Sequence, residues 1–194
     1  MLSFSQVLSQ AVKDSQATIA ALSGLEKPLE KAAGVIANCL TNGHKLLVCG
    51  NGGSAADAAD FTTEFACRFQ QDRSPFPALN LSQGGSLVTA TGNDYGFAEI
   101  FARQVAAFGQ PNDVLVAITT SGNSENIRRA LEEAKTRKLK TIALLGRDGG
   151  KCKGMAEIDL IVPSQITARI QEAHKFLLHV ICEAIDPQLR SKDV

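Results

Sequence analysis

The sequence predicts an α/β protein in which a parallel β-sheet is flanked by helices. Short apolar runs alternate with helical segments through most of the 194 residues. The runs are continuously apolar, which is typical of strands buried on both faces. Two of them end in polar, glycine-bearing turns that open a helix, the usual place for a ligand in such a sheet. We expect one domain over residues 1–194, because this length can bury a full hydrophobic core.

The first 42 residues have helical periodicity and predict a pair of helices before the first strand. Apolar side chains recur at helical spacing along residues 2–22 and again along 25–40, and Asn42-Gly43 is typical of a helix end. The pair cannot bury both apolar stripes within itself. We therefore expect residues 1–42 to pack on the later core or on another subunit.

Five strands and three further helices are predicted after residue 42. The strands are expected at Lys45–Cys49, Pro77–Leu81, Asp113–Ile118, Thr141–Leu145 and Ile158–Val162. The helices are expected from the first glycine turn to about Phe69, from about Asn123 to Lys138, and from Thr167 to Ile185, ending before Pro187. This order predicts a sheet covered on both faces, with ligands beyond the carboxyl ends of its strands.

Charge and cysteine usage exclude several classes of protein. Lys and Arg number 20, as do Asp and Glu, so the net charge is zero and gives no electrostatic case for a nucleic-acid partner. The five cysteines form no C-x-x-C pair, and buried reduced thiols in a cytoplasmic protein are the expected state. No signal-peptide pattern is present, and no apolar run approaches the length of about 20 residues that spans a membrane.

The segment TTSGNS, residues 119–124, lies between the third strand and a helix, where parallel sheets bind anions. Its four hydroxyls are donors of adjustable direction, and Gly122 lets the backbone approach a ligand. The alternative is a turn that only caps a helix. Ser124 has no acidic residue three positions later, so a capping box does not account for the cluster. The hydroxyl residues are Thr119, Thr120, Ser121 and Ser124.

A second glycine-rich turn, residues 50–54 (GNGGS), also follows a strand and opens a helix. It lacks the Gly-Lys-Ser/Thr ending of a P-loop and the spacing of a dinucleotide-binding fingerprint. Two such loops predict one ligand held from two sides. Because neither loop carries a dominant Lys or Arg, a sugar phosphate is favoured over a nucleoside triphosphate.

Carboxylates and histidines are grouped on two of the predicted helices. Asp60 and Glu64 are four residues apart and share a helix face, either at a site or as an exposed acidic face. On the last helix, Gln171 and His179 are eight residues apart and can edge one site. Helical periodicity does not decide whether His179 or His174 faces that site.

Several segments together resemble the sugar isomerase (SIS) family: GNGGSAADAADFTTEF, ALNLSQGGSLVTATGNDYGF, AFGQPNDVLVAITTSGNSENI, LLGRDGGK and ARIQEAHKFLLH. The resemblance covers roughly residues 30–186. It implies an SIS-type parallel sheet in a flavodoxin-like three-layer sandwich. It also implies a cytoplasmic homotetramer with shared active sites, one zinc ion per subunit, and no nucleic-acid or membrane partner.

The resemblance assigns roles residue by residue. It implies that Glu64 and His179 are catalytic, and that both hold zinc together with Gln171 and Asp60. The family usually has histidine where this chain has Asp60; a carboxylate is an acceptable zinc ligand but adds negative charge. The residues implied to bind substrate are Asn51, Gly52, Gly53, Glu64, Arg68, Asn93, Asp94, Thr119, Thr120, Ser121, Ser124 and Gln171.

The activity implied by the resemblance is an aldose–ketose isomerisation through an enediolate. Sedoheptulose 7-phosphate would become D-glycero-D-manno-heptose 7-phosphate for bacterial surface polysaccharide. Glu64 would move the proton between C1 and C2, and His179 would be the acid–base partner that exchanges protons with the oxygens. The alternative is a non-catalytic SIS adaptor that binds the bacterial replication initiator. Such adaptors tend to lose the catalytic acid and base, and this chain retains Glu64 and His179.

Overall fold

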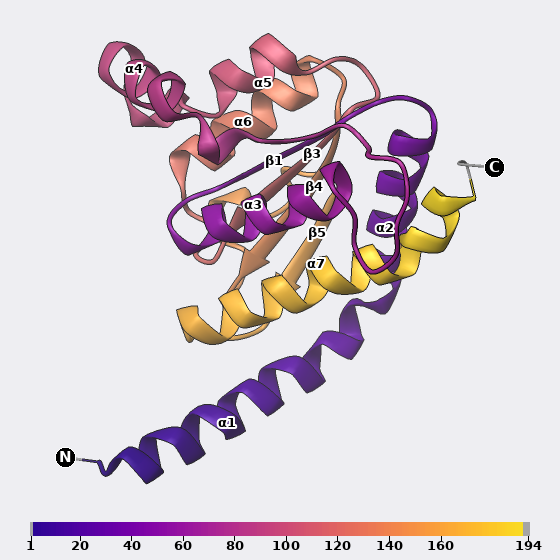
Figure 1. Ribbon diagram of the computed structural model, residues 1–194. Helices are drawn as coiled ribbons and strands as arrows, with labels where there is room; N and C mark the ends of the chain where they lie inside the picture. The colour runs from indigo at the N-terminus through magenta and orange to yellow at the C-terminus, as the bar shows by residue number, and fades with distance from the viewer. Residues whose placement is uncertain (1, 192–194) are drawn as a thin grey trace.

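The computed structural model describes residues 2–191, which fold around one five-stranded sheet (Figure 1). The helices are α1 (Phe4–Ala21), α2 (Glu26–Thr41), α3 (Gly53–Ala66), α4 (Gly85–Tyr95), α5 (Ala102–Phe108), α6 (Glu125–Thr136) and α7 (Thr167–Arg190). The strands are β1 (Leu46–Gly50), β2 (Ala78–Asn80), β3 (Val114–Thr119), β4 (Lys140–Gly146) and β5 (Ile158–Val162). All five predicted strands are therefore confirmed, with no end shifted by more than one residue.

The strands lie in the order β2-β1-β3-β4-β5 and every neighbouring pair is parallel. Side chains along β1 alternate between two cores. Leu46 and Val48 belong to a core under α2, α3 and α7, whereas Leu47 and Cys49 belong to one under α5 and α6. The predicted three-layer α/β arrangement is confirmed.

The strand order places a crevice between β1 and β3. These strands are neighbours, and Gly50 at the end of β1 is in register with Ile118. The chain leaves β1 toward α3 on one face and leaves β3 toward α6 on the other face. The loops after the two strands therefore diverge at the carboxyl edge, where open α/β sheets bind ligands.

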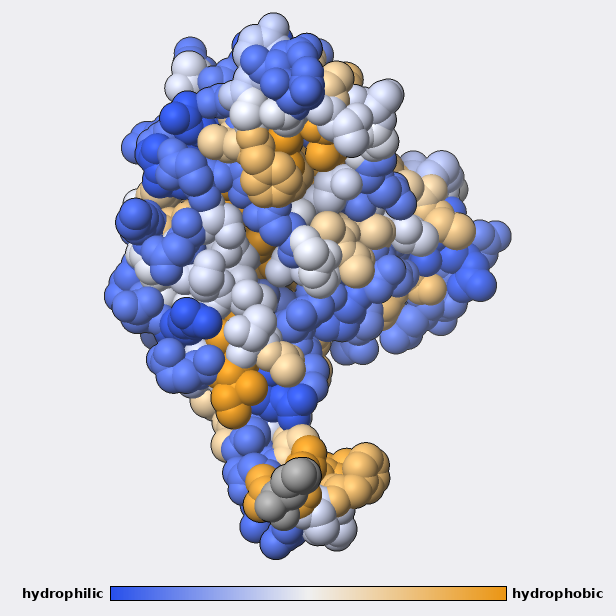
Figure 2. Space-filling model, turned by 90° about the vertical axis from the view of Figure 1, so that its left-hand side faces the viewer, coloured by the Kyte–Doolittle hydropathy of each residue, from blue (hydrophilic) through white to orange (hydrophobic). Residues whose placement is uncertain are grey.

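Helix α1 projects from the body of the molecule (Figure 1). It is attached to α7 from Ala11 onward, because Arg169 donates to the Ala11 carbonyl (2.7 Å) and Ser15 donates to Glu172 (2.7 Å). Residues 2–12 present apolar side chains to solvent, and Figure 2 shows them gathered at the projecting end. They are Leu2, Phe4, Val7, Leu8 and Val12.

Two expectations about helices were wrong or incomplete. The last helix does not stop before Pro187 but continues to Arg190. The cost of a helical proline is opposed by Leu189, which is fully buried in the core. Helices α4 and α5 were not predicted from the glycine- and threonine-rich segment between β2 and β3. Among the described residues, no helix has both the length and the apolar character needed to cross a membrane.

Candidate functional site

The hydroxyls of the loop after β3 form a compact cluster. Thr119 Oγ1 lies 3.2 Å from Ser124 Oγ and 3.4 Å from Ser121 Oγ. Ser124 is the N-cap of α6, but its side chain makes no capping hydrogen bond. The hydroxyls are thus turned toward one another and not toward the helix, and the amino end of α6 keeps N–H groups for an anion. Simple helix capping does not explain this loop.

Gly122 shapes the loop because no other residue can occupy its position. Its φ is +65°, and a Cβ there would come within 2.1 Å of the Gly149 carbonyl oxygen. The Gly122 carbonyl also accepts a hydrogen bond from the Cys152 N–H (2.9 Å). The segment after β4 therefore fixes the back of the loop.

We expect Gly122→Ala to weaken sugar-phosphate binding by at least tenfold, because the added methyl must displace one of the two backbones. The KM for substrate measures the effect. Gly24→Ala is the matched control, since nothing lies within 4 Å of a Cβ at Gly24. An unchanged KM in Gly122→Ala would show that the loop does not hold the substrate.

The glycine turn after β1 is bonded directly to the loop after β3. The side-chain amides of Asn51 and Asn126 each donate to the other's oxygen, and both distances are 2.9 Å. Asn126 lies in the first turn of α6 and is buried. The two predicted halves of the ligand site are therefore joined into one structure across the crevice.

The glycine turn also meets the last helix. A Cβ on Gly53 would lie 2.0 Å from Gln171 Nε2, so the glutamine amide packs against this turn. Ser82 locks the end of β1 by accepting from the Gly50 N–H (3.0 Å) and donating to the Gly50 carbonyl (2.8 Å). A cavity of about 160 Å³ opens beside Asn51 and Gly52.

Two aspartates of α3 share one lysine of α7. Lys175 Nζ lies 3.2 Å from Asp57 Oδ1 and is hydrogen-bonded to Asp60 Oδ2. Asp57 is buried and its Oδ2 has no hydrogen-bond partner among the described residues, whereas the Asp60 side chain is 63% exposed. Burial is the main cause that raises the pKa of Asp57, and Lys175 opposes it. Burial acts to lower the pKa of Lys175, but its bonds to Asp60 and Asp57 outweigh this and raise it.

Glu64 and His179 both lie on the contact between α3 and α7. His179 is close enough to Asp57 to act on the pKa of that carboxyl, and its ring centroid is 6.2 Å from that of Phe69. Glu64 is half-buried and contributes, after burial itself, to raising the pKa of the Cys182 thiol. Cys182 is one turn beyond His179, so the two predicted catalytic groups occupy the same end of the helix pair.

Arg73 holds the end of α3 that carries Glu64. Its guanidinium donates to the carbonyls of Glu64 (2.5 Å) and Phe65 (3.1 Å), and it pairs with Asp186 of α7 (3.2 Å). The Arg73 side chain is 1% exposed. A buried charge with this many partners fixes α3 against α7.

His174, the alternative to His179, is a core residue. It is completely buried, and its Nε2 lies 3.2 Å from the Leu145 carbonyl oxygen. Burial lowers its pKa to about 4, opposed only by that hydrogen bond. The neutral ring therefore donates to Leu145 and supports the carboxyl end of β4 from within the core.

The low pKa of His174 predicts that acid destabilises the fold. Between pH 6.5 and 4 the unfolded chain binds a proton at this residue and the native chain does not, so the free energy of unfolding falls with pH. This pKa shift lowers the free energy of unfolding by roughly 3 kcal/mol once the pH is below 4. Urea unfolding at pH 7 and 4.5 measures it, and His174→Gln should lose less stability over this interval than wild type.

Three residues matched to substrate binding are not gathered at the crevice. Arg68 is exposed and donates to the carbonyls of Phe69 (3.5 Å) and Gln70 (3.1 Å) in its own loop. Asn93 and Asp94 are exposed on α4 and bond to each other (2.8 Å). Within one chain, these three face solvent.

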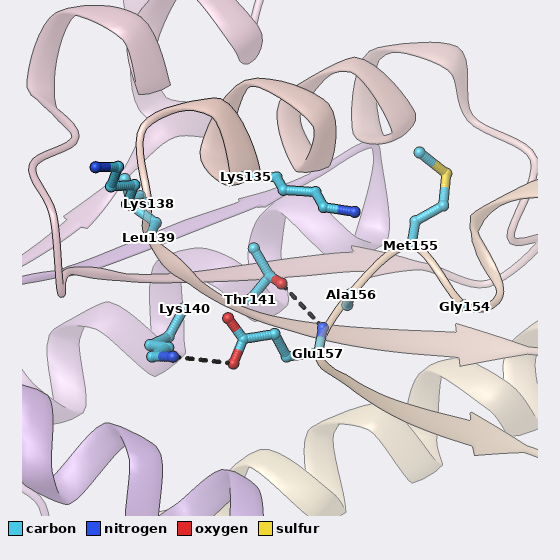
Figure 3. A pocket seen from close by; sticks show the side chains of 9 residues that line it. All are labelled: Lys135, Lys138, Leu139, Lys140, Thr141, Gly154, Met155, Ala156 and Glu157. Atoms are coloured by element: carbon cyan, nitrogen blue, oxygen red, sulfur yellow. Dashed lines mark hydrogen bonds and ion pairs between the residues drawn. The ribbon is translucent and has the colours of Figure 1, made fainter.

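A separate cavity of about 310 Å³ lies at the opposite edge of the sheet (Figure 3). It surrounds the start of β4, where Lys140 pairs with Glu157 (3.4 Å) and Thr141 accepts from the Glu157 N–H (3.0 Å). Ligands of open parallel sheets bind at the carboxyl ends of the strands, so this cavity is not part of the candidate site.

Sequence reasoning missed Asn126, Asp57 and Lys175. Asn126 gave a usable signal, because an amide in the first turn of α6 sits next to the hydroxyl loop. Asp57 is four residues from Phe61 on the buried face of α3, so helical periodicity indicates a core position and gives no sign of a functional carboxylate. Lys175 is four residues from both Gln171 and His179, but only the packing of α7 on α3 shows its partners.

The residues implied to hold zinc do not fit that role within the described chain. Across residues 2–191, no group of three or more His, Cys, Asp or Glu side chains is arranged to hold a metal ion. The Asp60 carboxylate is engaged by Lys175. The set of Asp60, Glu64, Gln171 and His179 is therefore spread along the helix pair around a lysine.

Comparison with known proteins gives consistent matches. The SIS domain family matches residues 10–146. A phosphoheptose isomerase of Shewanella loihica is 44% identical over 192 residues, covering 95% of this chain and 98% of that protein. The solved phosphoheptose isomerase of Francisella tularensis superposes with a TM-score of 0.91 at 43% identity, covering 96% of this chain and 100% of that one. That of Neisseria gonorrhoeae gives a TM-score of 0.89 at 41% identity, with 95% and 100% covered.

Proposed function

This chain belongs to the SIS-domain family, and we propose that it is an enzyme that converts sedoheptulose 7-phosphate to D-glycero-D-manno-heptose 7-phosphate. The phosphoheptose isomerases that it resembles match it over nearly their whole length. The product would supply heptose for bacterial surface polysaccharide. A cytoplasmic location remains a prediction.

The observation that carries the proposal is the joined pair of loops at the carboxyl edge of the sheet. The hydroxyls of residues 119–124 and the amino end of α6 supply neutral donors and a favourable dipole for a phosphate. The Asn51–Asn126 pair holds the glycine turn against the start of α6, beside these donors. A sugar with its phosphate in the loop would extend toward α3 and α7.

The chemistry proposed for Glu64 and His179 is proton transfer. The Glu64 carboxylate would remove the proton from the carbon next to the carbonyl, giving an enediolate, and return it to the former carbonyl carbon. His179 would give a proton to one oxygen and take one from the other. Each transfer by a positioned side chain is worth about 10²–10⁴-fold in rate. Gln171, against the glycine turn, would hold a sugar hydroxyl.

Zinc is the cofactor that the resemblance implies, with Asp60, Glu64, Gln171 and His179 as its ligands. If bound, it would polarise the carbonyl oxygen as a Lewis acid. Because Asp60 is paired with Lys175 and the donors are not clustered, we assign no step of the reaction to a metal.

We propose further that the chain assembles as a homotetramer with shared active sites. The support is the unpartnered apolar stripe at the projecting end of α1 (Figure 2). Arg68, Asn93 and Asp94 are exposed in one chain, and a partner would bring such residues to a shared site.

Charges placed on the stripe are expected to break the assembly. Light scattering should give four chains for wild type and fewer for Phe4→Asp combined with Leu8→Asp. Ser5→Asp, at an exposed polar position of the same helix, is the control. A double variant with the wild-type mass would exclude α1 from the interface.

The function is tested by incubating the purified protein with sedoheptulose 7-phosphate and following the sugars by NMR. We expect the aldoheptose phosphate to form, and no turnover of unphosphorylated sedoheptulose. Binding of the replication initiator without turnover would support the adaptor alternative instead. Nothing in the comparisons favours that alternative.

A further inference from the structure

Lys175 occupies the centre of the α7 face that meets α3. It lies four residues after Gln171 and four before His179, so the three side chains follow one another along one side of the helix. All three are half-buried. The lysine therefore stands between the two α7 residues that the resemblance assigns to the metal.

Helix α3 presents its own residues to this face in the same order. Gly53 meets Gln171, Asp57 and Asp60 meet Lys175, and Glu64 lies near Cys182, one turn beyond His179. The ammonium group is thus bounded on both helices by the residues that would ligate zinc. A side chain of this chain holds a positive charge in the middle of that set.

The Asp57 carboxylate needs a cationic partner. Asp57 is buried and one of its oxygens has no hydrogen-bond partner among the described residues, while Asp60 brings a second, exposed carboxylate one turn away. An uncompensated buried carboxylate is costly. A divalent metal would satisfy both carboxylates, and here Lys175 does so with a fixed charge.

Lys175 also keeps a donor for a ligand. An ammonium group has three N–H bonds, of which two are directed to Asp57 and Asp60. No third partner is found among residues 2–191, and the side chain is 28% exposed. The remaining N–H is available to an oxygen of a molecule bound beside Lys175.

We propose that the ammonium group of Lys175 takes the place of the divalent metal in this chain, neutralising Asp57 and Asp60 and stabilising the negative charge on the substrate oxygen. This rests on the proposed isomerase function. It follows that the enzyme works without zinc, that chelators leave its rate unchanged, and that removing the lysine charge exposes two carboxylates able to attract a metal.

Zinc binding and turnover of Lys175→Met test the proposal together. After chelator treatment, calorimetric titration with zinc chloride should show no micromolar site in wild type and a site at least tenfold tighter in Lys175→Met. The kcat should fall about 10²-fold in the variant, the usual effect of removing one preorganised charge, with KM changed much less. Lys175→Arg should stay within tenfold of wild type, and Lys135→Met on α6 should match wild type in both measurements.

Two results would overturn the proposal. One is a purified wild type that carries one zinc per chain and loses its rate when chelated. The other is a Lys175→Met variant that binds zinc no better than wild type or keeps the wild-type kcat. If wild type turns over no sugar phosphate at all, the proposed function fails, and the zinc titration still decides whether Lys175 replaces the metal.

Discussion

Replacing Glu64 with glutamine should lower kcat by about 10²–10⁴-fold and leave KM nearly unchanged. The amide has the size of the carboxylate but cannot accept the carbon-bound proton, so only the transition state is affected. Steady-state turnover of sedoheptulose 7-phosphate measures both constants. A solvent-deuterium exchange experiment should also show that the variant no longer exchanges the proton at the carbon next to the carbonyl.

The control for Glu64 is Glu183→Gln, an exposed glutamate on α7 beyond His179. It should keep the wild-type kcat, because its side chain is exposed to solvent, whereas that of Glu64 is half-buried. If Glu64→Gln and Glu183→Gln have equal rates, Glu64 is not the base. A large rise in KM at constant kcat would instead make Glu64 a binding residue.

Replacing Arg73 with methionine should destabilise the protein by about 3–5 kcal/mol, because it leaves Asp186 and the end of α3 without their buried partner. Urea unfolding at neutral pH measures the loss. Arg190→Met is the control: its Nε lies 3.1 Å from the other Asp186 oxygen without a hydrogen bond, and its side chain is 35% exposed. We expect that variant to lose about 1 kcal/mol or less.

A double variant separates the charge from the packing. In Arg73→Met combined with Asp186→Leu, no buried carboxylate is left unpaired, so the loss should be smaller than in Arg73→Met alone. The double variant should still have a reduced kcat, because the Glu64 and Phe65 carbonyls lose their donor and Glu64 is less firmly placed. If the double variant were only as stable as Arg73→Met, the loss of stability would come from the unpaired Glu64 and Phe65 carbonyls and not from the Asp186 charge.

The strands could be predicted closely because they are short, continuous apolar runs, and burial on both faces leaves that pattern directly in the sequence. Helix α7 was predicted to end early, since a local rule about Pro187 was outweighed by burial of Leu189. Helix α4 was missed because its glycines and threonines have weak helix propensities, and α5 was missed because it is only seven residues long.

One part of the candidate site could also be predicted from the sequence, and another part could not. The loop at 119–124 and the turn at 50–54 could be recognised because an anion site needs glycine, hydroxyls and a helix start close together in the sequence. The Asn51–Asn126 bond could not, because its partners are 75 residues apart and meet only when β1 and β3 pair.

By itself, the sequence determined the α/β class, the strands and the family, and it predicted the two candidate ligand loops, since each depends on local pattern or on the order of motifs. Only the tertiary structure decided what surrounds them. It placed His174 in the core and brought Lys175 between Asp57 and Asp60. It also showed that Arg73 donates a hydrogen bond to the main-chain carbonyl of Glu64. The reason is physical: a side chain's charge state and partners depend on which helix faces pack together, and that packing joins residues more than 100 positions apart.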